Sequence, residues 1–148
     1  MNISQIMTKD VVTVREDALI TEIASMITHQ RIHAVPVVDN ENKVIGIITE
    51  SDFFSKNSPA LVYLPTLLDF VRFGKLHEIS DQVETKEAVH NALAESIMST
   101  PCVTVHEGDD VYKFIRIAQE RGFNSVPVVD SEDKLVGIIT VMDILKLL

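Results

Sequence analysis

Gly46 to Asp52 reads G-I-I-T-E-S-D, and the same pattern returns at Gly137 to Asp143 as G-I-I-T-V-M-D. The surroundings of this stretch repeat as well, at a constant offset and without gaps. The other matched segments are Ile6-Met7 with Ile97-Met98, Val12-Thr13-Val14 with Val103-Thr104-Val105, and Val35 to Asp39 with Val126 to Asp130. Such self-similarity indicates two copies of one structural unit, called here the first and the second copy.

Each copy is predicted to fold as strand, helix, strand, strand, helix. The first strand is the β-branched run Val11 to Val14 or Cys102 to Val105, and the helix that follows is expected to begin near Asp17 and, in the second copy, to end at Gly122. The next two strands, Ala34 to Val38 and Val44 to Ile48 in the first copy, flank a polar, turn-forming run. Because Ala-Val-Pro-Val-Val is continuously apolar, we expect that strand to be buried on both faces.

The composition is that of a soluble globular chain of 148 residues, with 46% hydrophobic and 24% charged residues. One copy of about fifty residues buries too little surface to be stable by itself, so the two copies are expected to pack together across a pseudo-twofold axis. A net charge of −9 without a Lys/Arg cluster argues against binding nucleic acid. Polar residues interrupt the most apolar stretch, Ala60 to Leu76, so no membrane insertion is expected. A start without a signal pattern and a single cysteine, Cys102, favour the cytoplasm.

The repeated motif Gly-h-h-Thr-x-x-Asp, in which h is apolar, suits a nucleotide site. The glycine permits close approach to the strand, and a following helix start would offer amide N–H groups to a phosphate. The aspartate can accept from both vicinal hydroxyls of a ribose. An alternative is that Thr-x-x-Asp is only a helix capping box, in which both side chains satisfy backbone amides. Two copies at the same spacing favour the functional interpretation over the capping box alone.

These segments together resemble a tandem pair of CBS domains, the regulatory modules named after cystathionine beta-synthase. The resemblance covers about residues 3 to 55 and 94 to 148, and it rests on the I-M-T start, the V-T-V strand, the h-P-V-V-D strand and the G-h-h-T-x-x-D end. It implies an α/β (α+β) fold in which two pseudo-symmetric β-α-β-β-α repeats pack as one disc-like module. It also implies two clefts that bind adenosine compounds such as AMP, ADP, ATP or S-adenosylmethionine, and no catalysis.

The resemblance also implies roles for residues. Asp52 and Asp143 would hold ribose hydroxyls, and Thr49 and Thr140 would lie near ribose or phosphate. His33 and Asn124 occupy a position that often faces phosphate in the family. The residues that would line the adenine slots are Val12, Ala34, Val35 and Pro36 in the first copy, and Val103, Ser125, Val126 and Pro127 in the second.

The chain departs from the family pattern at the two variable positions of the motif. Many members place Arg or Lys there, whereas this chain has Glu50-Ser51 and Val141-Met142. Because charge-assisted phosphate contacts are therefore scarce, AMP or a lightly charged adenosyl ligand is favoured over ATP.

The segment between the copies has no counterpart in the repeat, which predicts the division 1–55 for the first copy, 56–95 for a mainly helical segment and 96–148 for the second copy. One helix is expected around Pro65 to Gly74 and another from about Glu84 through Leu93 into the second copy. The segment is interpreted as a linker that adds to the core, with a lid or dimer contact as the alternative.

The sequence thus favours a non-catalytic regulatory module that senses an adenosyl ligand, AMP above all, and acts as a homodimer on a partner protein that the sequence does not identify. The alternative is a ligand-independent interaction or dimerisation module with degenerate clefts. The sequence offers few candidate catalytic side chains, so no enzyme activity is expected. The five histidines lack the spacing of metal ligands, so no metal or required cofactor is expected.

Overall fold

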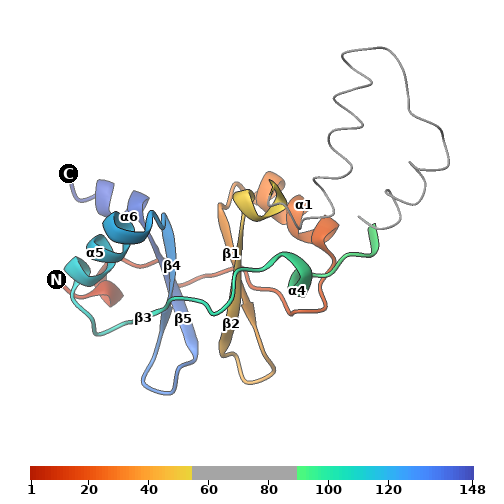
Figure 1. The fold of residues 1–148 in the computed structure, drawn as a ribbon. Coiled ribbons are helices and arrows are strands. Elements are labelled where there is room, and N and C mark those ends of the chain that lie inside the picture. The colour runs from red at the N-terminus through yellow and green to blue at the C-terminus, as the bar shows by residue number, and fades with distance from the viewer. Residues whose placement is uncertain (55–89) are drawn as a thin grey trace, which may run out of the picture. The chain divides into compact units, whose positions relative to one another are not determined.

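The computed structural model describes residues 1–54 and 90–148 of the chain. The first copy contains the 3-10 helix η1 (Ile3–Gln5), helix α1 (Ile20–Gln30), strands β1 (Ala34–Val38) and β2 (Val44–Thr49) and the 3-10 helix η2 (Glu50–Phe54) (Figure 1). The second copy contains α4 (Ala94–Ile97), β3 (Val105–His106), α5 (Val111–Arg121), β4 (Ser125–Val129), β5 (Leu135–Thr140) and α6 (Val141–Leu145). The predicted mixed α/β unit is confirmed.

The hairpins of the two copies are built by the same hydrogen bonds. In the first, the Asp39 carboxylate accepts from the amides of Glu41 at 2.8 Å and Lys43 at 3.0 Å. In the second, Asp130 accepts from the amides two and four residues further on, at the same two distances. An aspartate that binds its own backbone in this way fixes a tight turn, as the polar runs predict. All five residues of β1 are buried, which confirms the expectation for that strand.

The long helices α1 and α5 end alike but begin differently. Each ends at a residue in the left-handed conformation, Arg31 with φ 54° and Gly122 with φ 69°, and the glycine is the predicted one. At the start of α5, Asp110 accepts a hydrogen bond from the Tyr112 amide. The expected cap of α1, Asp17, is wrong, because the helix begins after Leu19, whose side chain accepts no bond.

The strand predicted to open each copy is much shorter than expected. In the first copy only Val14 makes a β-bridge, and in the second only β3 forms, pairing in parallel with β4. The β-branched residues before Val105 are thus in neither strand nor helix. A run of good strand formers becomes a strand only where a neighbouring strand edge is free to pair with it, and here that edge reaches only the end of the run.

The segment that opens each copy packs on the other copy. The Ile3 amide donates to the Asp109 carbonyl, and Thr8 pairs with Ile138 of β5 through two backbone hydrogen bonds of 2.9 Å. A Cβ added at Gly137 would lie 2.7 Å from the Met7 sulfur and 2.9 Å from the Thr8 carbonyl oxygen. The glycine of the second motif therefore makes room for a segment of the first copy.

The opening segment of the second copy packs in the same way on the first copy. The Ile20 amide, at the start of α1, donates to the Ala92 carbonyl, and the Ala94 amide donates to the Ala18 carbonyl. Leu93 is extended and pairs with Leu19, so the helix expected to run through Leu93 is interrupted there. The rest of that helix and the one predicted around Pro65 fall on residues outside the described part of the chain.

Two compact units result, and their boundaries differ from those of the repeats. One unit comprises Met1–Thr13, Pro36–Ile47 and Thr100–Leu148, and the other comprises Val14–Val35 and Ile48–Ser99. The core of the first unit is formed by side chains from η1, from the residues just after it, and from β3, α5, β4 and β5, namely Ile3, Met7, Val105, Val111, Phe114, Val126, Val128 and Ile139. Met7, at the start of the first repeat, is thus a core residue.

Candidate functional site

In the second copy, Thr140 and Asp143 form the predicted capping box at the junction of β5 and α6. Asp143 Oδ2 accepts from the Thr140 amide and the Thr140 hydroxyl, both at 2.9 Å, and the Asp143 amide donates back to Thr140 Oγ1 at 3.3 Å. The carboxylate is only 5% exposed. These amides are bonded within the motif, so the expectation that they are free to bind a phosphate is wrong for them.

The first copy repeats this arrangement at the junction of β2 and η2. Asp52 Oδ2 accepts from the Thr49 amide at 2.8 Å and from the Thr49 hydroxyl at 3.3 Å. Thr49 Oγ1 also lies 2.8 Å from the hydroxyl of Ser51. In both copies, therefore, one carboxylate oxygen is used to hold the threonine and to fix the orientation of the aspartate.

The other carboxylate oxygen has a different partner in each copy. Asp52 Oδ1 accepts from the hydroxyl of Ser99 at 3.0 Å, whereas Asp143 Oδ1 accepts from the ammonium of Lys146 at 3.2 Å. A neutral hydroxyl can be replaced by a ligand hydroxyl at no cost in charge, but displacing a lysine breaks an ion pair. Sequence reasoning missed both partners. For Ser99 a signal was available, because a Ser or Thr follows Ile-Met in each copy, whereas nothing in the repeat pointed to Lys146.

His33 and Asn124, the residues expected to face phosphate, each contact the first variable position of the motif in their own copy. His33 Nδ1 lies 2.7 Å from Glu50 Oε1, and both side chains are exposed, by 74% and 57%. At the equivalent place in the second copy, the Val141 amide donates to the carbonyl oxygen of Asn124 at 2.9 Å. The two copies thus bring the same two positions together, but only the first copy places ionisable side chains there.

The residues expected to line the adenine slots are mostly buried. Val35 and Val126 are inside the core, at 0% and 1% exposure, and the neighbouring prolines are buried too. Buried side chains leave only the strand backbone to face a ligand, so adenine contacts by these residues stay a prediction. The remaining expected residues are Ala34, which is buried, and Val12, Val103 and Ser125, which are half-buried.

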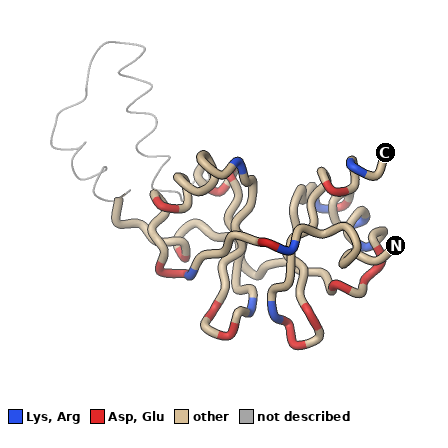
Figure 2. Tube along the Cα trace, turned by 180° about the vertical axis from the view of Figure 1, so that it is seen from behind, with Lys and Arg blue, Asp and Glu red and all other residues tan. Residues whose placement is uncertain are grey.

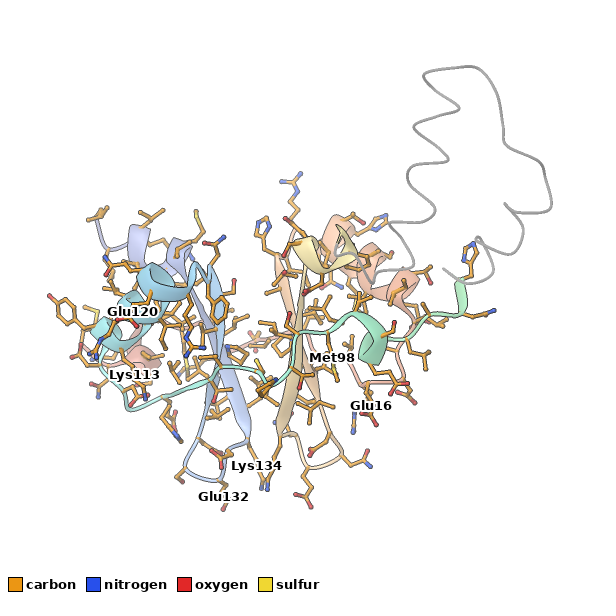
Figure 3. The ribbon with its side chains drawn as sticks, viewed as in Figure 1. Glu16, Met98, Lys113, Glu120, Glu132 and Lys134 are labelled. Carbon is orange, nitrogen blue, oxygen red and sulfur yellow. The ribbon has the colours of Figure 1, made fainter. Side chains whose placement is uncertain are left out.

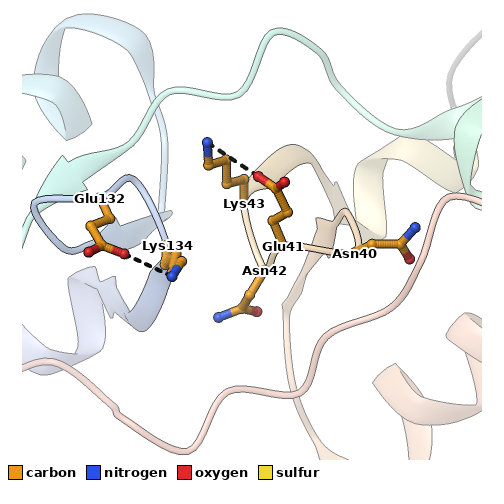
Figure 4. A pocket seen from close by; sticks show the side chains of 6 residues that line it. All are labelled: Asn40, Glu41, Asn42, Lys43, Glu132 and Lys134. Atoms are coloured by element: carbon orange, nitrogen blue, oxygen red, sulfur yellow. Dashed lines mark ion pairs between the residues drawn. The ribbon is translucent and has the colours of Figure 1, made fainter.

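A hollow lies between the β1–β2 turn and the β4–β5 turn, in the first compact unit (Figure 4). It is lined by polar side chains and has a volume of about 570 Å³. Lys134 pairs with Glu132 at 2.8 Å (Figure 3). Lys43 pairs with Glu41 at 3.5 Å, so each lysine is neutralised within its own turn (Figure 4). The Leu135 amide donates to the Asn42 carbonyl, which ties the two turns together. These contacts hold the two turns together, and we interpret the hollow as part of this structural link and not as a ligand site.

Over residues 1–54 and 90–148, no three His, Cys, Asp or Glu side chains gather in a way that could hold a metal ion. In the same residues, no helix is both long and apolar enough to cross a membrane. Figure 2 shows Lys and Arg scattered along the trace of the described residues, with Asp and Glu between them. Burial raises the pKa of Cys102 to about 11, which keeps this thiol protonated and unreactive at neutral pH.

Comparison with known proteins gives both copies the same family. The family model described as CBS domain matches residues 3–58 and 94–148. An uncharacterised protein of Methanopyrus kandleri is 27% identical over 146 residues, which are 99% of this chain and 62% of the relative. The chain spans 46% of the length of a second archaeal relative, from Methanocaldococcus jannaschii. The chain therefore corresponds to part of these longer proteins.

Solved structures share the fold over nearly the whole chain. The CBS domain of a CBS domain containing membrane protein from Sphaerobacter thermophilus is 32% identical, with a TM-score of 0.74 and coverage of 100% of this chain and 88% of that one. The CBS domain pair of protein MJ0100, in complex with 5'-methylthioadenosine and S-adenosyl-L-methionine, is 24% identical with a TM-score of 0.69, covering 99% and 94%. CBSX2 in complex with AMP is 18% identical with a TM-score of 0.71, covering 99% and 94%.

Proposed function

We propose that this chain, which belongs to the CBS domain family and carries two copies of the domain, is a non-catalytic regulatory module that senses adenosine-containing ligands. AMP is the favoured ligand, with ADP, ATP and S-adenosylmethionine as alternatives. The observation that carries the proposal is the geometry of the two aspartates. Each uses one carboxylate oxygen to hold the motif threonine and presents the other to an exchangeable partner.

Such a carboxylate suits a ribose. Its second oxygen can accept from a sugar hydroxyl, while the threonine keeps the group in place before the ligand arrives, which lowers the entropy lost on binding. Related CBS pairs have been solved with AMP, with S-adenosyl-L-methionine and with 5'-methylthioadenosine, which share an adenosine moiety. By analogy we assign the ribose role to Asp52 and Asp143, and the phosphate-facing positions to His33 and Asn124.

Titration calorimetry of ligand-free protein with adenosine, AMP, ATP and S-adenosylmethionine tests this assignment. We expect AMP to bind at one site or both, and Asp52→Ala and Asp143→Ala each to remove one site for an adenosyl ligand. A ligand at a hundred times its Kd would also stabilise the fold by about 2.7 kcal/mol, which a thermal shift detects. Absence of binding by all four ligands would contradict the proposal.

The module is further proposed to act as a homodimer in the cytoplasm, on a partner protein. An apolar groove of about 310 Å³ lies between α5 and α6, which run side by side next to β4 (Figure 1). Nearby on α6, Met142 and Leu145 are 55% and 54% exposed. Apolar helix surface of this kind is expected to be covered, and a second copy of the chain is the occupant we propose. Light scattering that gave the mass of one chain, 16.5 kDa, would contradict it.

The alternative is a ligand-independent interaction module. It is favoured by one observation, that the outer oxygen of Asp143 is already paired with Lys146 and that this carboxylate is nearly buried. It predicts that Asp52→Ala and Asp143→Ala leave partner binding unchanged at every concentration of AMP. A shift of partner affinity with AMP that either variant removes would exclude it.

A further inference from the structure

The two candidate sites differ in charge at the same two positions. In the first copy the Glu50 carboxylate is held 2.7 Å from the His33 ring, two residues from Asp52. In the second copy these positions are occupied by Val141 and Asn124, which carry no charge. The difference is local, because the hydrogen bond from the threonine amide to the aspartate carboxylate is the same in both copies.

The remaining charges increase the contrast. Among the groups that hydrogen bonds and ion pairs join at the first site, Glu50 and Asp52 are acidic, the hydroxyl partners are neutral and His33 is the only basic side chain. At the second site, Asp143 is paired with the Lys146 ammonium at 3.2 Å. The first site therefore carries more negative charge than the second, where the Lys146 ammonium offsets Asp143.

We propose that the two sites accept ligands of different charge, with Glu50 as the residue that sets the specificity of the first. This inference rests on the proposed function, since it assumes that each aspartate binds a ribose. The second-copy site takes an adenosine monophosphate. The first-copy site selects an adenosyl ligand without phosphate, either uncharged or carrying a cationic sulfonium or ammonium group.

Coulomb's law gives the size of the effect. A ribose on Asp52 would bring a 5' phosphate near Glu50, because both residues belong to η2 and lie two positions apart. Two unit charges about 6 Å apart, at an effective dielectric constant of about 40, change an equilibrium on the order of tenfold. His33 positions the carboxylate through its ring nitrogen, so that Glu50 is held at the site.

The test measures the affinities of adenosine, AMP and S-adenosylmethionine by calorimetry for the unaltered protein and for Glu50→Gln. We expect Glu50→Gln to strengthen AMP binding at the first site about tenfold, to weaken S-adenosylmethionine binding and to leave adenosine binding unchanged. Glu22→Gln, in the first turn of α1 at the opposite end from His33, removes the same charge and serves as the control. It should leave all three affinities unchanged.

Exchanging residues between the copies gives a second, independent readout. Val141→Glu combined with Asn124→His should lower AMP affinity at the second site while adenosine binding persists. Glu50→Val combined with His33→Asn should raise AMP affinity at the first site, again with adenosine binding retained. All four positions are exposed or half-buried, so the variants are expected to fold, which circular dichroism checks.

The outcomes separate the two proposals. If none of adenosine, AMP and S-adenosylmethionine binds, the proposed function fails and this inference fails with it. If adenosine binds but Glu50→Gln and Glu22→Gln change AMP affinity equally, only the charge selectivity is overturned. A tenfold change confined to Glu50→Gln supports both.

Discussion

The hairpin turns and the motif ends of the two copies have diverged to different degrees. In the turns, Asp39 and Asp130 make the same amide bonds at the same distances. At the motif ends, the Thr-Asp bonds are kept but the outer carboxylate oxygen meets Ser99 in one copy and Lys146 in the other. Bonds that build the unit are thus retained, while the partners of the outer carboxylate oxygen, where we propose that a ligand binds, differ. This contrast is what two unequal binding sites on one scaffold would require.

The largest expected effect tests whether the second motif's glycine serves packing. Gly137→Ala would bring a Cβ within 3 Å of the Met7 sulfur and the Thr8 carbonyl oxygen, and the backbone oxygen cannot move away without breaking its β-bridge. We expect a loss of about 1–3 kcal/mol in the free energy of unfolding, measured by urea denaturation. Gly108→Ala is the matched control, because nothing lies within 4 Å of its added Cβ. Equal effects of the two substitutions would refute the packing role.

A smaller effect is expected where the two long helices end. Arg31 holds the left-handed conformation that Gly122 holds in the second copy. Replacing Arg31 by glycine relieves strain, and the gain exceeds the added entropy of the unfolded chain by about 0.5–1 kcal/mol. Gly122→Ala should destabilise by a similar amount. Arg31→Ala removes the charge but keeps the strain, so stabilisation by this variant would mean that charge, not conformation, decides.

The smallest effect concerns the hairpin aspartates and pH. Hydrogen bonds from the amides of Lys134 and Glu132 hold the pKa of Asp130 below its ordinary value. A pKa lowered by folding stabilises the protein above the unfolded value of about 3.9, and this contribution is lost as pH falls through the folded value. Asp130→Asn should therefore remove part of the acid sensitivity of the urea midpoint between neutral pH and pH of about 3.

The first copy supplies the comparison for this pH prediction. Asp39→Asn should reproduce the effect, because Asp39 accepts the same two bonds at the same distances. An acid dependence that changes in only one of the two variants would show that the turns are less alike than their geometry indicates.

Much of the local structure could be predicted because the signals are local. The strand pair around Asp39, the helix end at Gly122 and the Thr-Asp pairs each depend on residues a few positions apart. The cap of α1 was predicted wrongly because Asp17 is a good capping residue by type, whereas the first amide of the helix is satisfied by the distant Ala92 carbonyl. The length of the opening strands was predicted wrongly for a similar reason, because a strand forms only where the edge of a neighbouring strand is free to pair with it.

The sequence alone determined that the chain contains two copies of one unit, which residues form their turns and which aspartates and threonines form their motifs. These features follow from repeated patterns and from hydrogen bonds between near neighbours. Only the tertiary structure decided that each copy's opening segment packs on the other, so that Ser99 reaches Asp52 and Met7 lies against Gly137. It also decided that Glu50 meets His33. Such contacts join residues far apart in the chain, and their formation depends on how strands and segments pair in space, which no local pattern encodes.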